Sequence, residues 1–285
     1  MRLGFGLGLE YSRLSGGSGY NAFIIEVKTD NAGTSNDNQF QFTGAEGDYD
    51  VVAKQNDIIV QTFSDLSDAA TITFANGAGT YVLEITPKAT NGFNRIKFND
   101  SGDKDKIKDV KQWGNIVWSS FSKAFKNCEY MLVTATDVPN LSQVTSLLEM
   151  FRQTKRADPD VSNWDTSNIT TLQDMFHEAE GANPDVRNWD VSNVTNMILT
   201  FFRSSFDRDI SNWDVSNVTD MKSIFEESNL SEENLTACYE NWSQLNLQQN
   251  VEFSAGNTKY NASGQAGRDI LVNTYNWIIE DGGQV

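Results

Sequence analysis

The sequence predicts an α+β protein in which an N-terminal β-sandwich is followed by a solenoid of strand–turn–helix repeats and a C-terminal α/β cap. Three observations predict this fold class. A motif of about twenty-five residues recurs in the middle of the chain, the segment before it alternates apolar and polar residues, and the segment after it has an amphipathic helical pattern. Alternation is typical of half-buried strands, and self-similarity at a fixed period is typical of stacked repeats.

The repeat is clearest between residues 160 and 225. Three copies carry the pattern Asn-Trp-Asp-x-Ser-Asn, and their tryptophans, Trp164, Trp189 and Trp213, lie 25 and 24 residues apart. Each copy closes on a phenylalanine, and alignment on this residue extends the array backwards to five units. The units close at Phe125, Phe151, Phe176, Phe201 and Phe225. Repeats of this kind share one continuous core when they stack.

Within a unit, apolar residues fall at the spacing of one helical face. Val194, Met197 and Phe201 are separated by three and four residues, and the other units repeat this spacing. The Ser-Asn pair before each run supplies side-chain oxygens of the type that cap a helix. The sequence therefore predicts a strand, a tight turn, a short helix and a loop in every unit.

The strand of each unit carries the candidate binding residues. The tryptophan and the residue two positions later share one face, which we expect to lie inward. The outward face then carries two columns of polar side chains, Asn163, Asn188 and Asn212 beside Asp165, Asp190 and Asp214. Adjacent strands lie roughly 4.8 Å apart, so these carboxylates repel one another unless they are hydrogen-bonded, neutralised or metal-bound.

Two interpretations of the aspartate column stay open. Each carboxylate can cap its own turn by accepting the amide of the serine two residues on, or the column can bind a ligand or Ca²⁺. Ca²⁺ is the one cofactor that this column suggests, and no other cofactor is predicted. No catalytic or metal-binding set is predicted, because the chain has one histidine, His177, and two isolated cysteines, Cys128 and Cys238. The tryptophan column suits carbohydrate stacking, but its core-facing position favours packing.

The chain divides into four predicted parts. Residues 1–19 form an anchor strand and a flexible linker, residues 20–100 a β-sandwich of about seven short strands, residues 101–229 the repeats and residues 230–285 the cap. In the anchor, apolar residues alternate with glycine at Leu3, Phe5, Leu7 and Leu9. These four side chains share one face of a strand, so we expect them to insert into a partner; a disordered terminus is the alternative.

Charge and composition exclude several classes of function. The net charge is −17, and residues 157–233 carry sixteen acidic and four basic residues, a net charge of −12. This acidity disfavours binding to nucleic acid and to anionic membranes. No run of eighteen apolar residues predicts a transmembrane helix. The first ten residues make a poor export signal, because glycines interrupt the apolar stretch and Glu10 ends it.

The repeats resemble those of BspA-like leucine-rich-repeat surface proteins, whose unit runs close to ISNWDVSNVTDMxxMF. Residues 210–225 match this unit, although Thr200 and Ile224 replace the methionine present at Met150 and Met175. The segment that leads into the array and the C-terminal end also resemble these proteins, so the similarity covers roughly residues 20–285. The sandwich is similar to an immunoglobulin-like module of the PKD type through the strand at residues 77–83, but it lacks the Trp-Gly-Asp-Gly loop of such modules.

The resemblance implies a surface-attachment protein, and the glycine-alternating start resembles the anchor peptides of phage virion appendages. We therefore expect a non-enzymatic tail, fibre or capsid-surface component of a phage virion. Its first residues would bind other virion proteins, its acidic solenoid would contact a host-surface glycan or protein, and homo-oligomers are possible. The alternatives are a structural joint or decoration protein of the virion and a bacterial cell-surface adhesin. A polysaccharide depolymerase is disfavoured, because the acidic residues that recur do so as scaffold residues.

Overall fold

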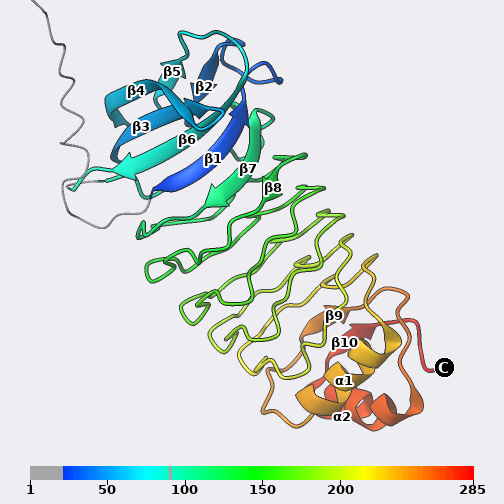
Figure 1. The fold of residues 1–285 in the computed structure, drawn as a ribbon. Helices are drawn as coiled ribbons and strands as arrows, with labels where there is room; N and C mark the ends of the chain where they lie inside the picture. The colour runs from blue at the N-terminus through cyan, green and yellow to red at the C-terminus, as the bar shows by residue number, and fades with distance from the viewer. Residues whose placement is uncertain (1–21, 90–91) are drawn as a thin grey trace, which may run out of the picture.

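The chain forms an elongated body with a sheet domain at one end, a stack of coils in the middle and two helices at the other end (Figure 1). These features come from a computed structural model, which describes residues 22–89 and 92–285. The predicted anchor residues Leu3, Phe5, Leu7 and Leu9 lie outside the described residues. None of the helices within the described ranges is long and apolar enough to cross a membrane.

The sheet domain contains a six-stranded sheet and a two-stranded sheet. The larger sheet has the order β4-β3-β6-β1-β7-β8. Its strands are β1 (Phe23–Lys28), β3 (Asp48–Gln55), β4 (Ile58–Ser67), β6 (Thr80–Pro87), β7 (Ile107–Gln112) and β8 (Leu132–Val133). All neighbouring pairs are antiparallel except β7 and β8, which are parallel. The smaller sheet pairs β2 (Gln39–Gln41) with β5 (Thr71–Thr73).

The two sheets pack through aromatic side chains, as in a sandwich. Phe42 contacts Tyr49 with ring centroids 5.1 Å apart, and Phe74 stacks on Tyr81 at 3.9 Å. Alternation places one face of each central strand in this core, and in β1 every second residue is buried. The alternation of apolar residues at 95–98 predicts a further strand of the sandwich, but these residues form none; Ile96 and Phe98 are fully buried as coil.

The sheet continues into the repeats without a break. Strand β7 pairs with β1 on one side and with β8 on the other, and β8 lies in the first coil. A buried ion pair reinforces this junction, because Asp103 and Lys106 are both fully buried with Oδ2 and Nζ 3.8 Å apart. Oxygen atoms of the loop from Ser35 to Gln39 surround the ammonium group.

The coils stack on a column of phenylalanines. Successive ring centroids from Phe125 to Phe225 are 5.9, 5.6, 6.0 and 5.9 Å apart. Backbone bonds join equivalent positions of neighbouring coils, as in Phe151 N to Met175 O at 2.9 Å and Phe176 N to Thr200 O at 2.9 Å. The predicted column of closing aromatics is therefore confirmed as a continuous core.

The predicted α+β class with strand–turn–helix repeats is wrong, because the protein is mostly sheet and turn. Residues 113–231, all of which are described, contain no helix. Two residues per coil are left-handed, for example Leu199 with φ of 56° and Arg203 with φ of 52°. Each is the third residue of a β-turn. The hydrogen bond from Thr200 N to Met197 O, 3.3 Å long, closes the first turn, and the bond from Ser204 N to Phe201 O, 3.2 Å long, closes the second. Left-handed backbone ends a right-handed helix, so the apolar spacing comes from consecutive turns.

The Ser-Asn pairs are not helix caps, since no helix follows them. Their asparagine side chains bind the preceding coil instead. Asn193 Nδ2 donates to Ser167 O at 2.8 Å, and Asn217 Nδ2 donates to Ser192 O at 2.8 Å. These bonds tie each coil to its neighbour along the stack axis.

The C-terminal segment covers the last coil with two helices and a pair of short strands. Its elements are α1 (Glu232–Trp242), β9 (Glu252–Ser254), the 3-10 turn η2 (Ala262–Gly264), α2 (Gln265–Tyr275) and β10 (Ile278–Glu280). Strand β9 pairs with β10 in parallel, and Phe253 bridges to Met221 of the last coil. The sequence predicts an apolar helix face of Leu235, Cys238, Trp242 and Leu245. The first three lie in α1 and are fully buried, whereas Leu245 lies beyond the helix and is partly buried.

Candidate functional site

The tryptophan face of each coil points inward and the Asn/Asp face points outward. Trp164, Trp189 and Trp213 are at most 4 % exposed. Two indole nitrogens donate to the preceding coil, Trp189 Nε1 to Val161 O at 2.9 Å and Trp213 Nε1 to Val186 O at 3.0 Å. The tryptophans are thus core residues, and two of them link neighbouring coils through their indole nitrogens. They leave no exposed ring face on which a sugar could stack.

All six candidate binding residues are exposed, and they line the same side of the stack. They are Asn163, Asn188, Asn212, Asp165, Asp190 and Asp214. Each aspartate caps its own turn. Asp165 Oδ1 accepts Ser167 N at 3.2 Å and Ser167 Oγ at 2.6 Å, and Asp190 and Asp214 accept the equivalent bonds from Ser192 and Ser216. These bonds are those of the turn-capping interpretation of the aspartate column.

These bonds stabilise the ionised carboxylates. Hydrogen bonds from the Ser167 hydroxyl and amide hold the pKa of Asp165 below its usual value, although the nearby carboxylate of Asp190 acts in the opposite direction. The Ser192 hydroxyl and amide lower the pKa of Asp190 in the same way. Asp165 and Asp190 are therefore anionic at neutral pH, and in all three aspartates the turn uses only one carboxylate oxygen.

A second polar surface follows each aspartate turn and was missed as a site by the sequence argument. It consists of exposed asparagine and threonine side chains that recur in three successive coils, Asn168, Asn193, Asn217, Thr170, Thr195 and Thr219. We call it the Asn/Thr strip. Its signal in the sequence is a repeated Asn-x-Thr triplet, whose asparagine belongs to the Ser-Asn pair that predicts a helix start.

A third surface carries paired charges that cross from coil to coil. Arg152 lies 3.3 Å from Asp174, and Arg203 lies 3.3 Å from Glu178. Burial acts to raise the pKa of Asp174, but hydrogen bonds from His177 and Gln173 outweigh it and keep the pKa below its usual value. The single histidine thus belongs to a structural charge network. The sequence does not reveal it, because different residue types occupy equivalent positions.

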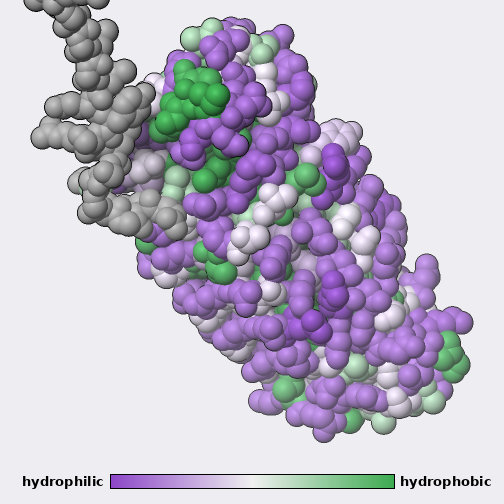
Figure 2. Space-filling view, viewed as in Figure 1, coloured by the Kyte–Doolittle hydropathy of each residue, from purple (hydrophilic) through white to green (hydrophobic). Residues whose placement is uncertain are grey.

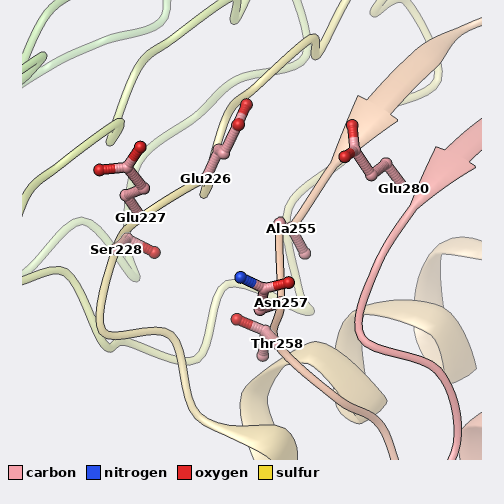
Figure 3. A pocket seen from close by; sticks show the side chains of 8 residues that line it. Glu226, Glu227, Ser228, Ala255, Asn257, Thr258 and Glu280 are labelled. Carbon is pink, nitrogen blue, oxygen red and sulfur yellow. The ribbon is translucent and has the colours of Figure 1, made fainter.

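A polar pocket of about 460 Å³ lies where the last coil meets the cap (Figure 3). Glu226 and Glu227 line it from the coil, Glu280 from β10, and Asn257 and Thr258 from the loop after β9. A hydrogen bond from Arg203 lowers the pKa of Glu227. The pocket lining contains no histidine or cysteine, and its polar side chains are carboxylates, hydroxyls and the amide of Asn257.

The visible face of the coil stack is largely hydrophilic, whereas a hydrophobic patch lies on the sheet domain (Figure 2). Ile58 and Ile59, at the start of β4, are 68 % and 51 % exposed. Among the described residues, no group of three or more histidine, cysteine, aspartate or glutamate side chains is arranged to hold a metal ion.

Comparison with protein families gives one match. Residues 119–242 match the family described as "Mycoplasma protein of unknown function, DUF285". The match covers less than half of the chain, and it spans the coils and helix α1 but not the sheet domain. It agrees with the resemblance of the repeats to BspA-like surface proteins. Comparison with curated proteins found no match, and comparison with solved structures found none either.

Proposed function

We propose that this protein is a non-enzymatic attachment protein whose coil stack contacts a host-surface glycan or protein. One observation carries the proposal. Polar side chains recur in three successive coils on the outside of a stack that hydrogen bonds and stacked rings hold together, so equivalent groups are presented in columns. Such a surface suits an extended or repetitive partner, because equal contacts repeated along a column add to one another.

We further propose that the protein is an appendage component of a phage virion, with residues 1–19 bound to other virion proteins. Support for this location comes from the sequence alone, from the glycine-alternating start at Leu3, Phe5, Leu7 and Leu9. A structural joint or decoration protein of the virion is the variant in which the stack binds another virion subunit.

A bacterial cell-surface adhesin is the second candidate, and the family match favours it. The matching family is described as a Mycoplasma protein, and its match falls on the coils that carry the polar columns. The two candidates share the binding surface and differ in what holds the other end of the molecule.

Deletion of residues 1–19 separates them. In phage particles produced from a genome with this deletion, we expect the protein to be absent while its soluble form keeps the wild-type circular dichroism spectrum. Unchanged incorporation into particles would contradict the anchor. Detection of the intact protein on bacterial cells that carry no phage would instead support the adhesin.

Binding to intact cells tests the attachment function itself. The fluorescently labelled full-length protein is expected to bind host cells saturably and to be displaced by the unlabelled protein. Absence of saturable binding would remove the attachment function. Release of reducing ends from host polysaccharide would point to a depolymerase and contradict the non-enzymatic assignment.

A further inference from the structure

The Asn/Thr strip has a regular construction that turn capping does not explain. Its asparagines and threonines are exposed and alternate along each coil with fully buried residues, for example Val194 between Asn193 and Thr195. Asn193 lies in a turn rather than a strand, but its side chain and that of Thr195 both donate to the preceding coil and are both exposed, so the pair lies on one side of the coil. Neighbouring coils repeat the pair, which gives two parallel columns of uncharged polar groups.

The hydroxyl hydrogens of the strip are used inside the stack. Thr170 Oγ1 donates to Thr145 O at 3.1 Å, Thr195 Oγ1 to Thr170 O at 3.3 Å and Thr219 Oγ1 to Thr195 O at 3.0 Å. The backbone N–H of each of these threonines bonds the same carbonyl, at 2.8, 2.9 and 2.9 Å. Each hydroxyl is therefore fixed in direction, with its single hydrogen turned along the stack axis.

The asparagines are fixed in the same sense. Their Nδ2 atoms donate to serine carbonyls of the preceding coil, at 2.8 Å from Asn193 and 2.8 Å from Asn217. Their Oδ1 atoms, like the threonine hydroxyl oxygens, keep lone pairs for a partner, since a hydroxyl oxygen has two acceptor sites and an amide oxygen has two. The strip thus offers mainly hydrogen-bond acceptors, preorganised at one set per coil.

The charge around the strip restricts what can use these acceptors. The strip is uncharged, but the exposed carboxylates of Asp165, Asp190 and Asp214 stand beside it, and residues 157–233 carry a net charge of −12. An anionic polymer is repelled by this field. The strip has no exposed apolar side chain, so a hydrophobic protein surface is not its complement either. A neutral partner rich in O–H donors fits both properties.

We propose that the Asn/Thr strip binds an extended, uncharged polysaccharide whose chain lies along the stack axis. Hydrogen-bonded coils repeat at roughly the spacing of adjacent strands, about 4.8 Å, so a chain that lies along the stack axis meets equivalent acceptors at regular short intervals. Successive sugars can then donate to successive threonine and asparagine oxygens. This inference rests on the proposed attachment function, and it names the class of ligand and assigns it to the strip rather than to the Asn/Asp columns.

The test is affinity electrophoresis of the full-length protein in gels that contain dextran, mannan or a soluble β-glucan as neutral probes, alginate as an anionic probe and glycol chitosan as a cationic probe. At least one neutral polysaccharide is expected to retard the protein. Because no charge pair is involved, the retardation should change less than twofold between 0.05 and 0.5 M salt, roughly the range over which exposed ionic contacts are screened.

Two sets of variants assign the retardation to the strip. The triple variant Thr170→Val, Thr195→Val and Thr219→Val keeps the β-branched shape and removes the acceptors, and binding should weaken at least about tenfold, as loss of about three hydrogen bonds implies. The matched Thr→Ser triple variant keeps the hydroxyls and should bind as the wild type does. If the valine variant fails to fold, the single variant Thr195→Arg blocks the strip with an outward side chain and should show the same loss.

The matched control next to the strip is the triple variant Asp165→Asn, Asp190→Asn and Asp214→Asn, which should leave retardation by neutral probes intact. Retardation by glycol chitosan alone, lost in this control, would overturn the proposal and leave attachment through the aspartate column. Cell binding that persists in the valine variant would overturn the strip as the surface but not attachment. Absence of both polysaccharide retardation and cell binding would overturn the proposal and the attachment function together.

Discussion

Replacement of Lys106 by methionine is expected to destabilise the protein strongly. The Lys106 ammonium is fully buried and donates to Ser35 O, Ser35 Oγ, Asn36 O and Gln39 O at 3.0, 2.7, 2.9 and 3.1 Å. Its carboxylate partner Asp103 is equally buried. Methionine matches the length of lysine but donates no hydrogen bond, so it leaves a buried negative charge without its counter-ion.

The magnitude follows from the burial of both partners. Removal of one member of a buried ion pair lowers the free energy of unfolding by about 3–5 kcal/mol. Asp103 keeps donors from Thr34 N, Ser35 N and Gln41 N at 2.9, 3.0 and 2.7 Å, which places Lys106→Met toward the lower end of this range. The variant Asp103→Asn/Lys106→Met should be less destabilised than the sum of the single variants, because each single change disrupts the same pair.

Urea unfolding followed by tryptophan fluorescence measures the effect. The exposed pair of Lys28 and Asp30, 2.6 Å apart, provides the control, and Lys28→Met should leave the midpoint unchanged within error. Equal midpoints for Lys106→Met and Lys28→Met would refute the reasoning, as would strict additivity in the double variant. Either result would mean that the loop from Ser35 to Gln39 is held by other contacts.

Three further predictions concern the coil stack. Phe176→Ala removes a fully buried ring from the phenylalanine column and should lower the free energy of unfolding by about 3–5 kcal/mol in urea titrations, whereas Phe202→Ala, at a half-buried position, should have a much smaller effect. Ser223→Gly relieves a left-handed residue, with φ of 52°, and should stabilise the protein by about 0.5–1 kcal/mol; Ser223→Ala keeps the strain, so an equal gain there would contradict the explanation. The Arg187 guanidinium lowers the pKa of Asp185 from 3.8 to about 2, so this carboxylate stabilises the fold above pH 3.8 and loses that contribution as the pH falls to about 2. The melting temperature of Asp185→Asn should therefore lie below that of the wild type at pH 7 and converge with it near pH 2, and a gap that persists at pH 2 would exclude this cause.

The sequence predicted the strands of the sheet domain and the core of the repeats well, because both depend on the period of apolar residues. The alternation in β1 and the equal spacing of Phe151, Phe176 and Phe201 translate directly into buried faces and stacked rings. The outward direction of Asp165 and Asp190 follows from the same alternation, and so does the exposure of the candidate binding residues.

The sequence failed where the backbone conformation, and not the apolar pattern, decides the structure. Left-handed φ angles occur at Leu199, Glu178 and Asp174, none of which is glycine, so their residue types do not predict this conformation. The apolar spacing around them fits a helix equally well. Backbone bonds from one coil to the next hold these turns in place, and such long-range bonds are invisible to a local pattern. The Asn/Thr strip was missed for the same reason.

The bonds between coils have a consequence for how the protein can vary in length. Each coil in the array bonds the one before and the one after it through equivalent atoms, as in Thr195 N to Thr170 O and Thr219 N to Thr195 O, both at 2.9 Å. Excision of residues 186–209, one full period, would join Asp185 to Ile210 and bring together surfaces that already fit. Duplication of the same segment would lengthen the molecule by one coil. The length of the array can therefore change by insertion or loss of single units while the sheet domain and the cap stay intact.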